Sequence, residues 1–244
     1  MEPERTREPV PEPEEPHHTL GLEVMSDAVR YRRYLLDLFE PHCGRTIIEF
    51  GSGLGDLAEE LRGYDRLTVT DVDPHCLREL SERFVGRPEI EVKRVDVREP
   101  DPVGASADTV LAVNVLEHIV DDVRALRRMA EAVFPGGNLI LFVPAYPSLY
   151  GPHDRAAGHV RRYVPKTLEA AVVDAGLTVE VLRPVNFLGG IAWWVAVRIG
   201  GCSSPNGGLV RLYDRLVVPL VRLMERRWHP PFGQSIFCVA RVPR

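Results

Sequence analysis

The chain lacks several features whose presence would narrow its function at once. It has no basic excess: its 244 residues carry a formal net charge of −5, and only two of its 30 basic residues are lysines. Proteins that bind nucleic acid usually carry a basic patch or stripe, so we expect no nucleic-acid partner. Its four cysteines are scattered, with no Cys-x-x-Cys pair. This spacing predicts reduced thiols and a cytoplasmic location.

Long apolar runs are also missing. The longest, residues 187–197, is too short to span a bilayer, and no signal peptide opens the chain. We therefore expect no membrane partner, and a homodimer is left open. Residues 1–18 are mostly Glu and Pro. They cannot bury enough apolar area to offset their ordering entropy, which predicts a disordered tail before a single domain at 19–244.

Three glycines lie close together directly after an apolar run near residue 50. A β-branched, apolar run at 46–50 stops at three alternating glycines, Gly51, Gly53 and Gly55, and a helical pattern follows. This order predicts a buried parallel strand, a tight turn and a helix N-terminus. Glycines there allow unusual backbone angles and let a ligand approach the main chain. We therefore expect a nucleotide-like cofactor at the carboxyl end of this strand.

The spacing of the glycines indicates which cofactor. A dinucleotide motif has its third glycine one residue later, where this chain has Asp56. Glu49 precedes Gly51 by two residues, and a carboxylate there suits a ligand with positive charge better than a pyrophosphate. Glu49-x-Gly51-x-Gly53-x-Gly55 resembles the first motif of the class I S-adenosylmethionine-dependent methyltransferases, here of a bacterial, small-molecule type.

Strands and helices alternate along the chain, which predicts an α/β fold with a doubly wound, mostly parallel sheet. The resemblance is close over 46–144 and looser to 165 and at the C-terminus. It implies the Rossmann-like methyltransferase fold, with seven strands in the order 3-2-1-4-5-7-6 and the last strand antiparallel. The strands expected are 46–50, 67–71, 90–97, 107–114, 138–143, 177–182 and 235–242, and the helices include 26–39, 121–134 and 165–175.

Candidate cofactor contacts lie at the ends of the first four strands. Asp71 follows Gly51 by 20 residues, a spacing that places a carboxylate near ribose hydroxyls. The resemblance implies that Asp96 meets the adenine amino group; a turn aspartate before Pro100 is the alternative. The full predicted cofactor set is Glu49, Gly51, Ser52, Gly53, Asp71, Val72, Asp96, Val97 and Asn114.

Candidate bases lie after the fourth strand and in a predicted substrate loop at 145–165. They are His118, His153, His159 and Tyr163. Histidine titrates near neutral pH, which suits removal of a proton from an acceptor. We rank His153 first, because neighbouring Asp154 could orient it, and His118 second. Alternatively, residues 159–163 fasten the loop to the sheet.

We expect no bound metal. Asn114, Glu117 and His118 have a spacing that could hold an ion together with His153 or His159. Some methyltransferases bind a divalent ion through a Glu-x-x-Glu-His motif. Here the first Glu is replaced by Asn114, which is a poorer ligand.

The segment 183–234 is a long excursion before the last strand, and we interpret it as a helical cap over the substrate. It contains predicted helices at 191–199 and 209–227. The second is amphipathic, with leucines on one side and arginines on the other. Candidate substrate contacts are aromatic, which favours a planar metabolite. They are Tyr31, Tyr146, Tyr150, Trp193 and Trp194.

The sequence thus predicts methyl transfer from S-adenosylmethionine to a small-molecule metabolite, with an aromatic one favoured. The acceptor atom, oxygen, nitrogen or carbon, stays open. Three alternatives remain. They are a nicotinamide-dependent oxidoreductase, a peripheral membrane methyltransferase that acts on a lipid and uses 209–227 as an interfacial anchor, and a non-catalytic cofactor-binding module.

Overall fold

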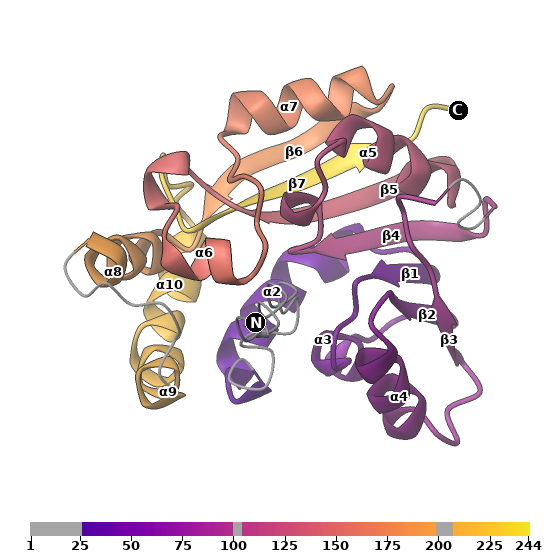
Figure 1. Ribbon diagram of the computed structural model, residues 1–244, viewed down its shortest axis with the longest axis horizontal. Helices are drawn as coiled ribbons and strands as arrows, with labels where there is room; N and C mark the ends of the chain where they lie inside the picture. The colour runs from indigo at the N-terminus through magenta and orange to yellow at the C-terminus, as the bar shows by residue number, and fades with distance from the viewer. Residues whose placement is uncertain (1–25, 100–103, 199–206) are drawn as a thin grey trace, which may run out of the picture.

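A seven-stranded sheet with helices on both faces organises the chain (Figure 1). The computed structural model describes residues 26–99, 104–198 and 207–244, and the predicted tail at 1–18 lies outside them. Within these ranges the strand order is β3-β2-β1-β4-β5-β7-β6, which confirms the predicted fold class. The strands are β1 Thr46–Phe50, β2 Arg66–Asp71, β3 Ile90–Arg94, β4 Ala107–Val113, β5 Val133–Pro144, β6 Thr178–Val185 and β7 Ser235–Arg241.

The strand directions determine which edge of the sheet can bind a ligand. β1 pairs in parallel with both β2 and β4, so that Ile47 lies between Leu67 and Thr109. β7 is antiparallel to β5 and β6, as predicted for the last strand. The carboxyl ends of β1, β2, β4 and β5 therefore share one edge, where open α/β sheets bind their ligands.

Two layers of helices cover the sheet, each with its own hydrophobic core. One core packs α5 and α7 on the sheet, and the other packs α2, α4 and α10 on the opposite face. Each fully buried Leu or Phe contributes about 1.5–3 kcal/mol. The helices are α2 Val29–Phe39, α3 Asp56–Glu60, α4 Pro74–Arg83, α5 Asp122–Glu131, α6 Pro152–Ala156, α7 Pro165–Asp174, α8 Phe187–Arg198, α9 Gly207–Leu216 and α10 Val218–Glu225, with 3₁₀ turns η1 Glu40–His42, η2 Leu116–His118 and η3 Pro147–Leu149.

Two strand ends differ from the prediction. β3 ends at Arg94 rather than at residue 97, because its only neighbour β2 ends at Asp71, which pairs with Arg94. β5 begins earlier than expected, at Val133. The Pro-Gly-Gly segment lies inside it, since Gly136 N–H donates to the Val242 carbonyl at 2.9 Å.

The cap also differs from the prediction. The expected helix at 209–227 is divided into α9 and α10. Pro219 has no N–H with which to continue the helical ladder. Backbone bonds from Val217 to Tyr213 and from Val221 to Val217 bridge the break, at 2.8 and 3.0 Å. The helix expected at 191–199 begins four residues earlier, at Phe187.

Candidate functional site

The turn after β1 requires glycine. Gly51 and Gly53 have φ angles of +67° and +54°, which side chains other than glycine rarely adopt. A Cβ on Gly51 would lie 2.7 Å from a methyl group of Val115. The turn therefore keeps its backbone bare at the carboxyl edge of the sheet.

The third glycine has a different purpose. A Cβ on Gly55 would lie 2.8 Å from Leu80 and 3.0 Å from Phe84, both on α4. Gly55 thus lets α3 and α4 approach each other, which is the packing function that the dinucleotide motif assigns one position later. Asp56 begins α3 and instead accepts a hydrogen bond from Arg83 at 2.6 Å.

Glu49 is a buried acid at the end of β1. It is only 3% exposed, and its Oε2 atom has no hydrogen-bond partner among the residues that the structure describes. Burial raises the pKa of Glu49 to about 7, against a lowering by Ser52. An unpartnered buried carboxylate is costly unless a cation or donor meets it. The position therefore fits a positively charged ligand such as a sulfonium with an ammonium group.

Asp71 shapes the turn that the cofactor would meet. Its carboxylate accepts backbone N–H groups of Gly53 at 2.9 Å, Val72 at 2.8 Å and Asp73 at 2.9 Å. Burial nevertheless raises the pKa of Asp71. A carboxylate has about four acceptor positions, so room is left for ribose hydroxyls. Val72 is partly exposed beside it.

Of the remaining predicted cofactor residues, some are accessible to a ligand and others already bond or pack within the protein. Ser52 links β1 to β2, because its N–H donates to the Thr70 carbonyl at 2.8 Å. Asn114 is exposed after β4, with a φ of +53°. Arg98 holds both oxygens of Asp96 and lowers the pKa of that carboxyl. Val97 is buried in the core, so its side chain packs rather than facing solvent.

Asp154 orients a histidine, but not the one expected. Its Oδ1 atom lies 2.8 Å from His159 Nδ1 and also accepts Arg162 Nε at 2.8 Å, while Oδ2 accepts Gly151 N–H. The prediction that Asp154 orients His153 is therefore wrong. Neighbouring side chains on a helix point apart, and the His153 ring lies 5.3 Å from that of Trp193.

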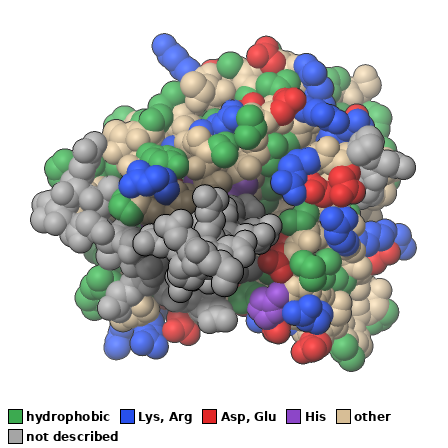
Figure 2. Space-filling view, in the orientation of Figure 1, with side chains coloured by type: hydrophobic (Ala, Val, Ile, Leu, Met, Phe, Trp, Pro, Cys, Tyr) green, Lys and Arg blue, Asp and Glu red, His purple; other side chains and the backbone are tan. Residues whose placement is uncertain are grey.

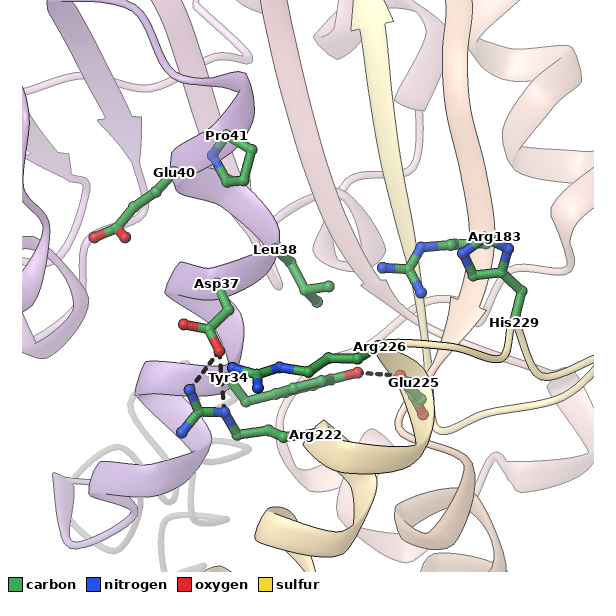
Figure 3. A pocket seen from close by; sticks show the side chains of 10 residues that line it. All are labelled: Tyr34, Asp37, Leu38, Glu40, Pro41, Arg183, Arg222, Glu225, Arg226 and His229. Atoms are coloured by element: carbon green, nitrogen blue, oxygen red, sulfur yellow. Dashed lines mark hydrogen bonds and ion pairs between the residues drawn. The ribbon is translucent and has the colours of Figure 1, made fainter.

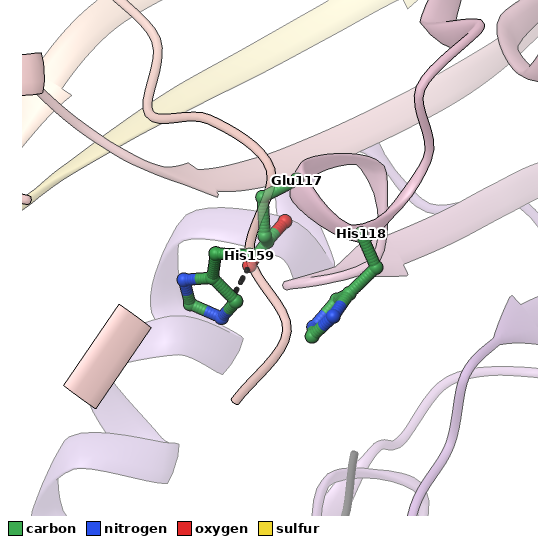
Figure 4. Close-up of side chains that lie close together, drawn as sticks. All are labelled: Glu117, His118 and His159. Atoms are coloured by element: carbon green, nitrogen blue, oxygen red, sulfur yellow. Dashed lines mark ion pairs between the residues drawn. The ribbon is translucent and has the colours of Figure 1, made fainter. Parts of the chain in front are cut away.

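Glu117 lies behind the oriented histidine (Figure 4). It is fully buried, and within the described part of the chain neither carboxylate oxygen has a hydrogen-bond partner. Burial raises the pKa of Glu117 to about 7, against a lowering by His159, whose Nε2 lies 3.9 Å away. The His118 ring packs edge-on to the His159 ring at 4.7 Å. One donor atom each from Glu117, His118 and His159 lie within 4.8 Å of one another, a spacing at which three ligands could hold a divalent ion.

Tyr163 fastens the substrate loop rather than facing the site. It is 2% exposed, and its hydroxyl donates to Asp122 at 2.9 Å. Burial and the nearby carboxylate raise the pKa of Tyr163, so the phenol stays protonated. Its backbone also pairs with the end of β5 through Tyr146 N–H at 2.7 Å. The assignment of Tyr163 as a base is therefore wrong, and the alternative that it fastens the loop is confirmed.

The predicted substrate residues do not line a single pocket. The Tyr31 ring lies 6.0 Å from that of Tyr34, and Tyr150 donates to the His159 carbonyl at 2.7 Å. Trp193 donates to the Leu149 carbonyl at 3.1 Å. Tyr146 stacks on Phe232 at 4.8 Å. Trp194 lines a pocket of about 340 Å³ together with Ser148, Leu149, Ile191 and Phe232.

A second, larger pocket lies away from these residues. It has a volume of about 510 Å³ and lies between α2 and α10, under Arg183 (Figure 3). Arg222 is paired with Asp37 there, and Tyr34 donates to Glu225 at 2.6 Å. No predicted site residue lines it, so it does not belong to the site at the strand ends.

Sequence reasoning missed three residues of the site and one buried residue between β6 and α8. Asp154 was noted only as a neighbour of His153, and Arg162 only as part of a basic run. Glu117 was considered only as a metal ligand. Asn186 carried no sequence signal, yet it is 1% exposed with a φ of +61° and accepts the Tyr213 hydroxyl.

Comparison with known proteins agrees with the strand-end geometry. The methyltransferase domain family matches residues 25–182, well over half of the chain. The chain belongs to this family, the class I S-adenosylmethionine-dependent methyltransferases. S-adenosylmethionine is accordingly its cofactor.

Individual relatives differ in what they act on. A probable S-adenosylmethionine-dependent methyltransferase of Mycobacterium tuberculosis is 24% identical over 64% of this chain and 57% of its own length. A ribosomal RNA small subunit methyltransferase A of Dehalococcoides mccartyi is 26% identical over 74% of this chain and 55% of its own. The chain spans about half the length of the curated relatives it matches.

Solved structures share the fold. An S-adenosylmethionine-dependent methyltransferase from Mesorhizobium loti superposes with a TM-score of 0.58 at 16% identity. The superposition covers 85% of this chain and 95% of that one. At this identity the likeness concerns the fold alone.

Proposed function

We propose that this methyltransferase transfers the methyl group of S-adenosylmethionine to a small-molecule metabolite with a flat, aromatic part. The observation that carries the proposal is the apolar pocket beside the substrate loop, lined by Leu149, Ile191, Trp194 and Phe232. Aromatic side chains provide broad contact area for a planar group. The net charge of −5 supports such an acceptor over the RNA substrates named for some relatives.

Positioning supplies most of the catalysis in this proposal. The bound cofactor supplies an electrophilic methyl group. Glu49 offers a carboxylate to the positive charge, Asp71 holds the turn, and the bare backbone at Gly51 admits the ligand. Alignment of donor and acceptor can contribute about 7–11 kcal/mol to lowering the barrier.

A proton is removed by the oriented imidazole if the acceptor carries one. Because Asp154 accepts from Nδ1 of His159, the proton resides there and Nε2 is the basic nitrogen. We therefore place His159 first among the bases, ahead of His118 and of His153. A base in this position contributes about 10²–10⁴-fold to the rate.

The cysteines bear on the location of the protein in the cell. We infer a cytoplasmic enzyme, which accords with the free thiols of Cys43, Cys76 and Cys238. Among residues 26–99, 104–198 and 207–244, no helix has the length and apolarity needed to cross a bilayer.

A screen of acceptors tests the proposal. Purified enzyme, methyl-labelled S-adenosylmethionine and panels of phenols, aromatic amines, RNA and phospholipids are combined, and mass spectrometry detects the labelled product. The proposal expects label in an aromatic metabolite. Label only in RNA would refute it. A thermal shift with NADH but not with S-adenosylhomocysteine would instead indicate a nicotinamide-dependent oxidoreductase.

A further inference from the structure

The two cap helices α9 and α10 present a row of leucines to solvent. We define the leucine face by these side chains, which are 53–64% exposed: Leu209, Leu212, Leu216, Leu220 and Leu223. They recur at intervals of three and four residues, which places them on one side of a helix. They are all of the exposed leucines in the part of the chain that the structure describes.

Buried acids fix the orientation of this face. Asp214 is 5% exposed and caps α2 by accepting the N–H groups of Arg30 at 3.2 Å and Tyr31 at 2.8 Å. Glu225 is 6% exposed and accepts the Tyr34 hydroxyl at 2.6 Å and Phe187 N–H at 3.0 Å. A rotation that buried the leucines would expose or break these bonds. The leucines are therefore held outward.

Positive charge predominates around the leucine face. Between residues 207 and 228 the chain carries five arginines and only the two acids Asp214 and Glu225, both buried. Arg222 is paired with Asp37, and Arg211 lies 3.4 Å from Asp27. The structure records no ion pair for Arg215, Arg226 or Arg227 within its described residues, and all three are exposed. A local excess of three positive charges thus stands on a chain of net charge −5.

Aromatic side chains extend the face at its ends. Trp228 follows α10 and is 42% exposed, and its ring contacts Phe187 at the start of α8. Figure 1 shows α8, α9 and α10 gathered at one end of the molecule, and Figure 2 shows green and blue side chains at its lower left edge, with an acidic side chain beside them.

We propose that the leucine face docks the enzyme on an anionic lipid membrane. The leucines enter the boundary between head groups and acyl chains, while the neighbouring arginines meet lipid phosphates. Helical periodicity places Arg211, Arg215, Arg222 and Arg226 along one flank of the leucine row, as this arrangement requires. The occupant is a lipid surface rather than a protein, because Arg215, Arg226 and Arg227 leave an excess of exposed positive charge beside the face, and its exposed apolar residues are leucine and tryptophan.

This proposal does not depend on the identity of the acceptor, and binding is measured without activity. The full chain is sedimented with vesicles of phosphatidylcholine alone and of phosphatidylcholine mixed with phosphatidylglycerol. We expect binding to the mixed vesicles that weakens with added salt. The leucine variant Leu216→Asp with Leu220→Asp should lose roughly tenfold or more in affinity.

A second variant and a matched control separate charge from apolarity. Arg215→Gln, Arg226→Gln and Arg227→Gln together should weaken binding to the mixed vesicles about 100-fold, since each arginine near an anionic surface contributes about fivefold. The control Val85→Asp with Val173→Asp changes two exposed apolar residues outside the cap, 78% and 57% exposed, and should bind like the parent chain. Hydrogen exchange of residues 209–224 should slow on adding mixed vesicles.

Several results would overturn the proposal. Absence of binding to mixed vesicles would do so, as would equal binding to both kinds of vesicle. A loss of affinity in the control variant as large as that in the leucine variant would also overturn it. A lipid-free dimer in sedimentation velocity that the leucine variant dissociates would assign the face to a second copy. Faster exchange at 209–224 after removal of residues 1–18 would assign it to the chain's own N-terminal segment.

Discussion

Replacing Asp154 by asparagine separates the structural and the catalytic consequences of the loop after β5. The substitution keeps the size of the side chain and removes its charge. Asp154 is fully buried and contacts Arg162, whose side chain is 3% exposed, and His159. Asparagine can still accept the Gly151 N–H, but it leaves the Arg162 guanidinium without a counter-charge.

The expected loss of stability is large. Breaking a buried ion pair by removing one partner costs about 3–5 kcal/mol. For a chain of this size each kcal/mol shifts the melting temperature by about 2–4 °C, so Asp154→Asn should melt roughly 6–20 °C lower. If His159 is the base, kcat should also fall by about 10²–10⁴-fold, because asparagine does not hold the same tautomer as well.

The difference should depend on pH in a defined direction. Burial alone would raise the pKa of Asp154, but bonds from His159 and Arg162 lower it below the ordinary value. A lowered folded-state pKa stabilises the protein above the unfolded value of about 3.9, and this contribution is lost as pH falls through the folded pKa. The gap between parent and variant should therefore be full near neutrality and shrink in acid.

Thermal melts and steady-state kinetics of both chains are the assay, with Asp65→Asn as the matched control. Asp65 pairs with Arg45 at the surface, where the side chains are 62% and 66% exposed, so its loss should leave the melting temperature close to that of the parent. If Asp154→Asn melts with the parent, the argument from the buried pair is refuted. If it melts lower yet keeps full kcat, Asp154 stabilises the loop without orienting a base.

Three further predictions concern the histidines, the N-terminus and metal. His159→Ala should lower kcat about 10²–10⁴-fold with cofactor affinity unchanged, whereas His153→Ala should lower kcat by less than about tenfold. The reverse order in kinetics would restore His153 as the base. Deleting residues 1–16 should leave the melting temperature and cofactor affinity intact, and a drop of many degrees would show a docked segment. Dialysis against EDTA should leave activity unchanged; a loss that Mg²⁺ or Zn²⁺ restores would make the Glu117–His118–His159 cluster a metal site.

Much of the fold could be predicted because its signals are local. The β-branched run at 46–50 ending in glycine identified β1, and the alternation of strands and helices identified the sheet. Boundaries were less predictable where they depend on a neighbour. β3 stops where β2 stops, which the residues of β3 alone do not encode. Pro219, by contrast, was a readable reason to divide the cap helix.

The site was harder because it depends on pairing across the fold. Adjacency suggested that Asp154 serves His153, but the helix turns their side chains apart and the loop brings His159 back to the carboxylate. The leucine row in α9 and α10 was also visible in the sequence. Amphipathicity alone does not say which side is buried, and here the buried side is the one with valines and two bonded acids, Asp214 and Glu225.

Calorimetry with S-adenosylhomocysteine tests the central claim most directly. The parent chain should bind one equivalent, and Asp71→Ala should bind roughly 10–100-fold more weakly, because charge-assisted bonds of about 1.5–3 kcal/mol each are lost. Asp73→Ala is the matched control on the same turn, since its carboxylate caps α4 through His75 N–H, and it should keep parental affinity. No heat of binding from the folded parent chain, or equal affinity in parent and Asp71→Ala, would contradict the assignment of this strand-end site to S-adenosylmethionine.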